Sequence, residues 1–331
     1  MKMSFVSSAL AVALSLAGIV AASAPRDAVA QEKSYKFALS LGWTEGESGQ
    51  HLDRGYRDAV AAMGGELTVA DASYDAKRQS DQIDAFVQSK PDALFVTASD
   101  PAAIAPAVKR AIDAGIPVFA ADSLIPGVAV TSTAMSNNFG MGEYSARFIA
   151  EKLGGKGKIA LVDLPANETW DLRAHGLRWA LRQYPDIEIV GTWSYNSTGA
   201  TTPRAGVESL LTAHPDIQAV WSAWDGAAME GALAIRAAGK DGVFTTGIDG
   251  GKQVFTHINS DTGVALSMAQ SFYEMAQLNV YYAHEVLAGR KAPRIITTPV
   301  YAVTKDVLKG EVPDDYDVPG RAQQLGWQRA L

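Results

Sequence analysis

Two tryptophans and an aspartate stand close together in the segment WSAWDG, residues 221–226. The apolar run before this segment is typical of a buried strand, and GAAMEGALAIRAAG after it is typical of a helix. Trp224 and Asp225 therefore stand at a strand-to-helix junction, where a flat ring and a carboxylate could meet a ligand. Because an aspartate that begins a helix often caps it, a capping role for Asp225 is the alternative.

Other polar and aromatic residues stand in the same kind of position, at or just after the end of an apolar run. Carboxylate, guanidinium and amide groups suit the hydroxyls of a sugar or polyol, and indole rings suit its C–H faces. The mixture at one edge of a sheet indicates a small-molecule site rather than a catalytic centre. The candidate ligand-binding residues are Trp43, Glu45, Asp122, Trp170, Arg173, Trp224, Asp225, Asp249 and Gln270.

The elements that must position these residues alternate between short apolar runs and amphipathic segments from Lys36 onward. The apolar runs are continuous, as expected of strands buried on both faces, and they include 128–133 and 295–304. A Gly-rich turn at 152–158 separates two sets of repeated βαβ units. We therefore predict an α/β fold of two similar, doubly wound parallel-sheet lobes, with a ligand cleft beyond the carboxyl ends of the strands. The tail, 311–331, is expected to wrap the surface.

The N-terminus reads as a secretory signal peptide. It opens with Lys2, continues through a small-residue apolar run from Ala9 to Ala22, and reaches an A-x-A pattern that predicts cleavage after Ala30. No second long apolar run follows, so we expect an exported protein of the periplasm that is not embedded in a membrane. The absence of cysteine excludes disulfides, thiol chemistry and a lipid-modified N-terminal cysteine.

Composition and motifs exclude several classes of protein. A net charge of −7 and a sequence pI near 5.3, without any basic cluster, argue against a nucleic-acid partner. The chain has neither a P-loop nor a clean dinucleotide-binding glycine motif after a strand. Its five histidines are scattered without an H-x₃-H pair, so we expect no metal and no cofactor.

Five segments resemble the type I periplasmic sugar-binding proteins of ABC importers, in the ribose-binding-like branch: AGIPVFAADS (114–123), LRAHG (172–176), LLTAHPDIQAVWSAWDGAAMEGALAIRAAG (210–239), TTGIDGG (245–251) and SMAQ (267–270). The resemblance extends from about Lys36 to Thr304. It implies that Asp122 and Asp249 accept ligand hydrogen bonds and that Arg173 donates them. Gln270 is then at a crossover between lobes, and Trp224 replaces an asparagine that is common in relatives. On this basis Arg173→Ala should lose affinity with little change in the melting temperature of the ligand-free protein.

The resemblance also implies the domain organisation and the partners. A signal peptide covers 1–30, an N-terminal lobe 31–135 with 271–298, and a C-terminal lobe 136–270 with 299–331. Three crossings, near 134–137, 270 and 298–300, form a hinge that closes the lobes around a sugar. The implied protein is a monomer that delivers its ligand to the membrane permease of an ABC importer.

The sequence departs from the ribose-binding pattern in two places. After the first strand it has WTEGESGQ (43–50) instead of an asparagine and two phenylalanines, and Ser123 stands where the pattern has an arginine. The departures favour another pentose, a hexose or a linear polyol as ligand. Three alternatives remain: the sensor half of a LacI-type repressor, a protein that presents its ligand to a membrane receptor, and an exported glycoside hydrolase. The hydrolase would use Asp122 with Asp225 or Asp249 as an acid/base pair.

Overall fold

The computed structural model describes residues 34–165, 167–196, 201–313 and 318–331. The predicted signal peptide and its cleavage site lie outside these residues. Within the described part of the chain, no helix has the length and apolar character needed to cross a membrane.

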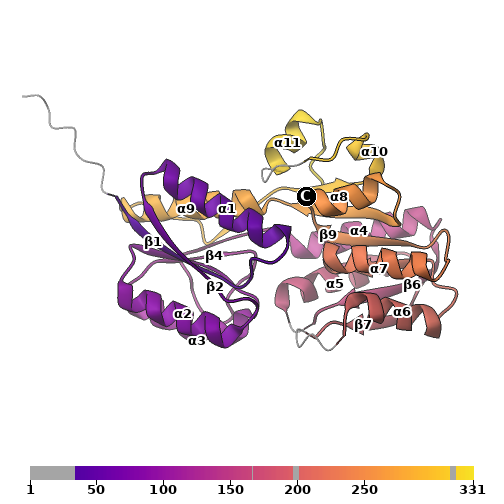
Figure 1. The fold of residues 1–331 in the computed structure, drawn as a ribbon, viewed down its shortest axis with the longest axis horizontal. Helices are drawn as coiled ribbons and strands as arrows, with labels where there is room; N and C mark the ends of the chain where they lie inside the picture. The colour runs from indigo at the N-terminus through magenta and orange to yellow at the C-terminus, as the bar shows by residue number, and fades with distance from the viewer. Residues whose placement is uncertain (1–33, 166, 197–200, 314–317) are drawn as a thin grey trace, which may run out of the picture. The chain divides into compact units, whose positions relative to one another are not determined.

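The first lobe is built on a six-stranded sheet of order β11-β5-β4-β3-β1-β2, in which all neighbouring strands pair in parallel. Helices α1 and α9 cover one face of this sheet, and α2 and α3 cover the other (Figure 1). Its elements are β1 (Lys36–Leu41), α1 (Glu47–Ala62), β2 (Glu66–Asp71), α2 (Ala76–Ser89), β3 (Ala93–Thr97), α3 (Pro101–Asp113), β4 (Val118–Ala121), β5 (Ser132–Met135), α9 (Phe272–Leu287) and β11 (Ile295–Thr297).

The second lobe repeats this plan with a sheet of order β12-β10-β9-β8-β6-β7. Helices α4 and α5 pack on one face, and α6 and α7 on the other. Its elements are α4 (Asn138–Lys152), β6 (Lys156–Asp163), α5 (Glu168–Leu181), β7 (Asp186–Ser194), α6 (Pro203–Ala213), β8 (Ala219–Ser222), α7 (Asp225–Ala237), β9 (Phe244–Asp249), α8 (Lys252–Asn259), β10 (Val264–Gln270) and β12 (Val300–Val303). The predicted fold of two doubly wound lobes is confirmed, with one antiparallel pair, β10 with β12.

Local sequence explains where the elements begin and why they are buried. The strand ALFVT of β3 is buried at every position, as a strand covered on both faces must be. Asp100 caps α3 by accepting a hydrogen bond from the Ala103 N–H at 2.9 Å, and Pro101 occupies the first turn, where no N–H is needed. The apolar runs and the cap residues therefore fix the alternation of strand and helix that the sequence predicts.

The chain passes between the two sheets three times. It leaves β5 at Met135 and enters α4, it leaves β10 at Gln270 and enters α9, and it leaves β11 at Thr297 and enters β12. The sequence predicts one strand over 295–304, but the structure divides it at Thr298 and Pro299. Proline lacks an N–H for a sheet ladder, which explains the break. The strand predicted over 128–133 instead begins at Ser132.

Two glycines allow α4 and α5 to cross with their backbones in contact. A Cβ atom at Gly142 would collide with the carbonyl oxygen of Arg173, and a Cβ atom at Gly176 would collide with that of Phe139. Only glycine permits this approach, and it places Arg173 of α5 beside the start of α4.

The C-terminal tail does more than wrap the surface. It contains α11 (Val318–Gln324), which packs together with α10 (Lys305–Leu308), with α8 and with the edge of the second sheet. Trp327 is buried there against the rings of Phe255 and Tyr301, at centroid distances of 5.7 and 6.3 Å. The tail therefore completes a small hydrophobic core that it shares with α8, β10 and β12.

Candidate functional site

Predicted site residues stand at the carboxyl ends of three neighbouring strands in the second sheet. Trp224 and Asp225 follow β8, Asp249 ends β9, and Gln270 ends β10. Since β8 pairs with β9 and β9 with β10 in parallel, these ends lie at the same edge of the sheet. This edge is where open parallel sheets bind their ligands.

Arg173 is at the centre of the polar groups at this edge, and its side chain is fully buried. Its Nε donates to Asn138 Oδ1 at 2.9 Å, and its Nη1 donates to the carbonyl oxygen of Ala223 at 2.7 Å and to Asp249 Oδ1 at 3.1 Å. Gln270 Nε2 donates to the same Asp249 oxygen at 2.9 Å. The structure therefore brings Arg173, Asp249 and Gln270, three predicted residues, into one hydrogen-bonded cluster, which we call the polar cluster.

Two acceptor atoms near the polar cluster, Gln270 Oε1 and Asp122 Oδ1, are buried without a hydrogen-bond partner among the described residues. Asp122 follows β4 of the first lobe, in a left-handed backbone conformation with φ 69°. Burial raises the pKa of its carboxyl, and the charge of Arg173 opposes this rise. A carboxylate of the first lobe thus lies within the electrostatic reach of a guanidinium of the second.

Asp249 carries an uncommon backbone conformation and a perturbed carboxyl. Its φ of 137° is far from the values that residues with side chains prefer. Burial raises the pKa of its carboxyl to about 6, and the charge of Asp122 contributes to this rise, although Arg173 and Gln270 stabilise the ionised form. A strained residue with a raised pKa at the edge of a sheet is typical of a functional site.

Asp225 is bonded inside its own lobe and does not cap α7. It is the first residue of that helix, and its Oδ2 accepts hydrogen bonds from the Gly250 N–H at 2.6 Å and from Ser267 Oγ at 2.8 Å. Its side chain therefore joins the end of β9 to β10. Burial and the neighbouring charge of Asp249 raise the pKa of Asp225 to about 8. In this geometry the carboxyl holds the loop that carries Asp249.

Three aromatic rings gather at the same edge of the second lobe. Trp170 and Trp224 stack with their centroids 5.0 Å apart and their planes at 9°. Tyr195, which follows β7, lies 5.5 Å from Trp224 at an angle of 52°. The sequence reasoning omitted Tyr195, although its place directly after a strand is the signal that selected the other residues.

The first lobe has an aromatic pair of its own. Trp43 follows β1 and stacks on Tyr74, which follows β2, with centroids 6.1 Å apart and planes at 12°. Trp43 Nε1 donates to Ser48 Oγ at 3.2 Å. Glu45 is exposed on the same loop and acts electrostatically on Tyr74, so it lies beside this pair and makes no hydrogen bond to the polar cluster. Tyr74 is a second aromatic residue that sequence reasoning missed.

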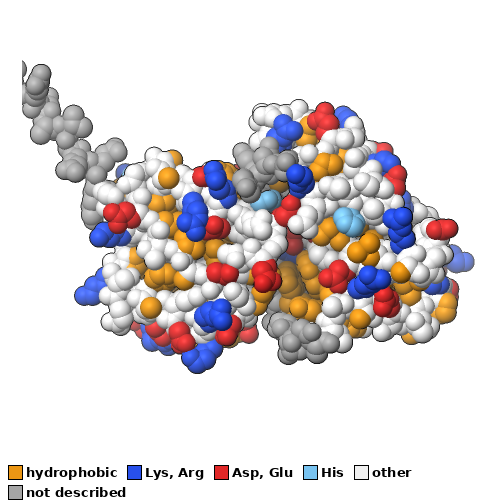
Figure 2. Space-filling view, viewed as in Figure 1, with side chains coloured by type: hydrophobic (Ala, Val, Ile, Leu, Met, Phe, Trp, Pro, Cys, Tyr) orange, Lys and Arg blue, Asp and Glu red, His pale blue; other side chains and the backbone are white. Residues whose placement is uncertain are grey.

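Hydrogen bonds between loops at the strand ends connect the two lobes. Ser123 Oγ and Thr169 Oγ1 are 2.9 Å apart, and Asn167 Nδ2 donates to the carbonyl oxygen of Ser99 at 3.1 Å. Glu47 Oε2 accepts from the N–H of Gln253, at the N-terminus of α8, at 3.0 Å. Hydrophobic and acidic side chains gather where the lobes meet (Figure 2).

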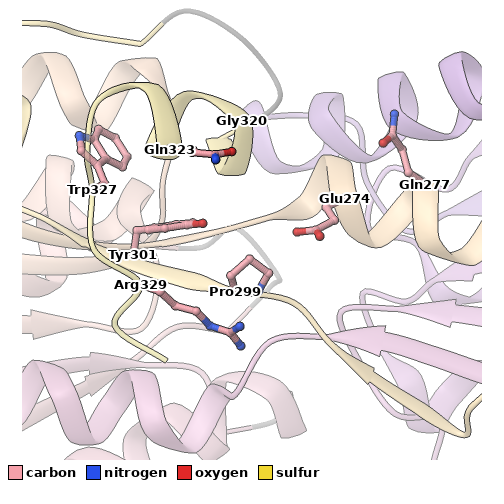
Figure 3. A pocket seen from close by; sticks show the side chains of 8 residues that line it. All are labelled: Glu274, Gln277, Pro299, Tyr301, Gly320, Gln323, Trp327 and Arg329. Atoms are coloured by element: carbon pink, nitrogen blue, oxygen red, sulfur yellow. The ribbon is translucent and has the colours of Figure 1, made fainter.

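A cavity of about 580 Å³ lies away from these residues. It is formed where the third crossing, the beginning of α9 and the C-terminal tail meet (Figure 3). Its lining residues are Glu274, Gln277, Pro299, Tyr301, Gly320, Gln323, Trp327 and Arg329. None of the predicted ligand-binding residues is among them. In the described part of the chain, no group of three or more His, Asp and Glu side chains could hold a metal ion.

Comparisons with known proteins agree with the fold. Residues 37–291 match the model of the family described as periplasmic binding protein domain. The chain is 28% identical over 275 residues to the ribose import binding protein RbsB of Bacillus subtilis, covering 83% of this chain and 88% of that one. It is 24% identical over 245 residues to the xylitol-binding protein of Mycolicibacterium smegmatis, covering 73% and 69%.

A solved structure shows the same fold. An ABC transporter solute-binding protein from Agrobacterium vitis, bound with α-D-tagatopyranose, superposes with a TM-score of 0.78 at 24% identity, covering 84% of this chain and 97% of that one. Since the family model matches more than half of the chain, the resemblance found in the sequence is confirmed: this chain belongs to the periplasmic binding protein family, and its two lobes have the type I fold.

Proposed function

We propose that this protein captures a monosaccharide or polyol between its two lobes and delivers it to the membrane permease of an ABC importer. The observation that carries the proposal is the polar cluster of Arg173, Asp249 and Gln270, with unpartnered acceptors beside it and aromatic rings around it. Relatives named for ribose and xylitol support a neutral polyhydroxylated ligand.

The polar cluster is arranged to bind hydroxyl groups. Gln270 Oε1 and Asp122 Oδ1 can each accept a hydrogen bond from a ligand hydroxyl. Arg173 Nη2 makes no hydrogen bond to the described residues, so its two N–H groups can donate to ligand oxygens. A sugar or polyol supplies both the donors and the acceptors that these atoms need.

The aromatic rings suit the remaining surface of such a ligand. Because Trp170 already covers one face of Trp224, the two rings form a rigid stack rather than two separate platforms. The C–H face of a sugar can pack on the outer surface of this stack, with Tyr195 beside it. We therefore assign ligand contact to Trp43, Asp122, Trp170, Arg173, Trp224, Asp249 and Gln270, and a supporting role to Asp225, through the loop that carries Asp249. Glu45 is placed at the rim.

The proposal also covers the cleavage, location, domain organisation and oligomeric state of the protein. The mature chain begins at Gln31 in the periplasm, has lobes 31–135 with 271–298 and 136–270 with 299–331, and acts as a monomer without enzymatic activity. The geometry disfavours Asp225 as the acid or base of a hydrolase, because its Oδ2 already accepts hydrogen bonds from Gly250 and Ser267 within its own lobe.

A thermal-shift screen of the mature protein with pentoses, hexoses and pentitols tests the proposal. A ligand at one hundred times its dissociation constant stabilises the folded state by about 2.7 kcal/mol. At roughly 2–4 °C per kcal/mol, the melting temperature should rise by about 5–10 °C. A panel without any shift contradicts sugar capture, and mass spectrometry that shows turnover of a bound sugar contradicts a pure binding role.

A further inference from the structure

The loop after β2 holds Tyr74 in a conformation that tyrosine rarely adopts. Ser73 and Tyr74 are consecutive left-handed residues, with φ 50° and φ 64°. Asp71 fixes the turn, since its Oδ1 accepts from the Ser73 N–H at 2.9 Å and its Oδ2 accepts from Thr44 Oγ1 at 2.6 Å. The Tyr74 N–H donates to the carbonyl oxygen of Gly42 at 2.7 Å.

The interior of the protein does not explain this conformation. The Tyr74 side chain is 46% exposed and belongs to none of the hydrophobic cores, and its ring contact is with Trp43. Glycine would satisfy the backbone without strain. An aromatic residue kept in a strained position and left half exposed is typical of a residue that meets a ligand.

Charged groups of the second lobe act on Tyr74. Partial burial raises the pKa of its hydroxyl to about 12, and the charges of Glu45, Asp249 and Tyr195 add to this rise. Two of these three residues belong to the second lobe, and Asp249 is part of the polar cluster. The Tyr74 hydroxyl is therefore close enough to the polar cluster for its charges to act on it.

The positions of the rings repeat between the lobes. Trp43 and Tyr74 follow β1 and β2, an inner strand and the edge strand next to it. Trp170 and Tyr195 follow β6 and β7, which hold the corresponding positions in the second sheet. Each lobe thus supplies a tryptophan and a tyrosine from the segments that follow these two strands, with Trp170 in the first turn of α5.

We infer that Tyr74 is a specificity-determining residue: its ring, supported by Trp43, closes the ligand site from the first lobe, and its hydroxyl binds a ligand hydroxyl on the side opposite the stacked tryptophans. The inference rests on the proposed function, because it takes a sugar or polyol as the ligand. A neutral phenol at this place distinguishes epimers, since only a correctly oriented hydroxyl satisfies it.

Two substitutions test the inference, with the tightest of D-ribose, xylitol and D-tagatose in the wild type as the probe. Tyr74→Gly removes the ring and relieves the backbone, so the dissociation constant should rise by about tenfold or more while the melting temperature of the ligand-free protein stays equal or rises. Tyr74→Phe removes only the hydroxyl, and it should raise the dissociation constant of the preferred probe by about three- to tenfold. The ratio of the dissociation constants of the other two probes to that of the preferred probe should become smaller. Isothermal titration calorimetry measures the constants.

Tyr281→Gly and Tyr281→Phe are the matched controls, because Tyr281 is 47% exposed on α9 and contacts Tyr282 rather than the site. Both should bind the probe as the wild type does. If both Tyr74 variants keep the wild-type affinity and selectivity, the inference is wrong. If Tyr74→Gly lowers the melting temperature by several degrees and leaves the affinity unchanged, Tyr74 serves the fold instead. If the wild type binds none of the three, the three tightest ligands of the thermal-shift panel replace them as probes, and a wild type that binds no member of that panel contradicts the proposed function, whatever the variants do.

Discussion

Arg173→Ala tests whether the polar cluster supports the fold as well as the ligand. The resemblance in sequence suggests a residue that matters only for affinity. The structure gives a different expectation, because the buried guanidinium donates to Asn138, to the Ala223 carbonyl and to Asp249. Its removal takes a donor from Asn138 Oδ1, from the Ala223 carbonyl oxygen and from the largely buried Asp249 carboxylate, which keeps the hydrogen bond from Gln270.

The size of the effect follows from this geometry. Breaking a buried ion pair by removing one partner costs about 3–5 kcal/mol, because the other charge remains buried. At roughly 2–4 °C per kcal/mol, the ligand-free protein should melt about 6–20 °C lower than the wild type. The deficit should shrink toward pH 5, since a neutral Asp249 carboxyl no longer needs the guanidinium. Binding of the wild-type ligand should fall below detection.

Differential scanning calorimetry at pH 5 and pH 8 measures the melting temperatures. Arg178→Ala is the matched control, since the Arg178 side chain lies on the same helix, is 43% exposed, and makes one hydrogen bond, to Thr192 Oγ1 at 3.3 Å, and one long ion pair, to Asp163 at 4.0 Å. It should melt within about 2 °C of the wild type. An Arg173→Ala protein that melts like this control at both pH values would refute the argument that the polar cluster is part of the core.

Three further predictions concern charge and closure. Asp225→Asn keeps an acceptor for Gly250 and Ser267 but removes the ionisable group. Because the folded pKa of about 8 lies above the unfolded value, the contribution of Asp225 to wild-type stability falls as the pH rises from about 4 to 8. The melting temperature of the variant relative to the wild type should therefore increase over that pH range, and a pH-independent difference would contradict this. Ligand hydroxyls that donate to Asp249 favour its ionised form, so ligand affinity should increase up to about pH 6 and then level off. Titration calorimetry should show that ligand binding releases protons at pH 5.5 but not at pH 7.5. Equal proton release at both pH values would count against a contact between the ligand and Asp249. Glu47→Ala removes the acceptor for the Gln253 N–H, a hydrogen bond between the lobes. It should weaken ligand binding by about tenfold and reduce the ligand-induced compaction that small-angle scattering measures. Glu47→Gln keeps an acceptor and should retain most of the affinity and most of the compaction.

Much of the fold could be predicted because each signal is local. Continuous apolar runs identify strands buried on both faces, and these runs alternate with helical patterns, which imposes parallel pairing. The end of each run then indicates which polar residues share an edge, and this reasoning placed Asp249 and Gln270 together before any geometry was known. Arg173 is selected in the same way, from the segment that follows β6, although it lies within α5; the resemblance adds its role as a hydrogen-bond donor.

The remaining features depend on contacts that sequence spacing does not encode. The stacking of Trp170 on Trp224 joins residues more than fifty positions apart, and the hydrogen bonds of Asp225 to Gly250 and Ser267 join three segments. Tyr74 stands in a short loop between β2 and α2, where periodicity has no meaning. Its left-handed backbone is set by the side chain of Asp71 rather than by a glycine, which is the residue that a sequence pattern would have signalled.

The segments that carry the proposed ligand-binding residues are also segments that join the lobes. Ser123 follows Asp122, and its partner Thr169 precedes Trp170, so a bond between the lobes lies one residue from a ligand-binding position on each side. Arg173 of one lobe acts electrostatically on Asp122 of the other. A ligand that bonds Asp122 and Arg173 together therefore stabilises the arrangement in which Ser123 meets Thr169, and it makes weaker contacts with lobes that are apart. By linkage, we expect this difference in contacts to favour closed lobes, whereas a molecule that satisfies only one lobe, however tightly it binds there, should leave the equilibrium between open and closed lobes unchanged.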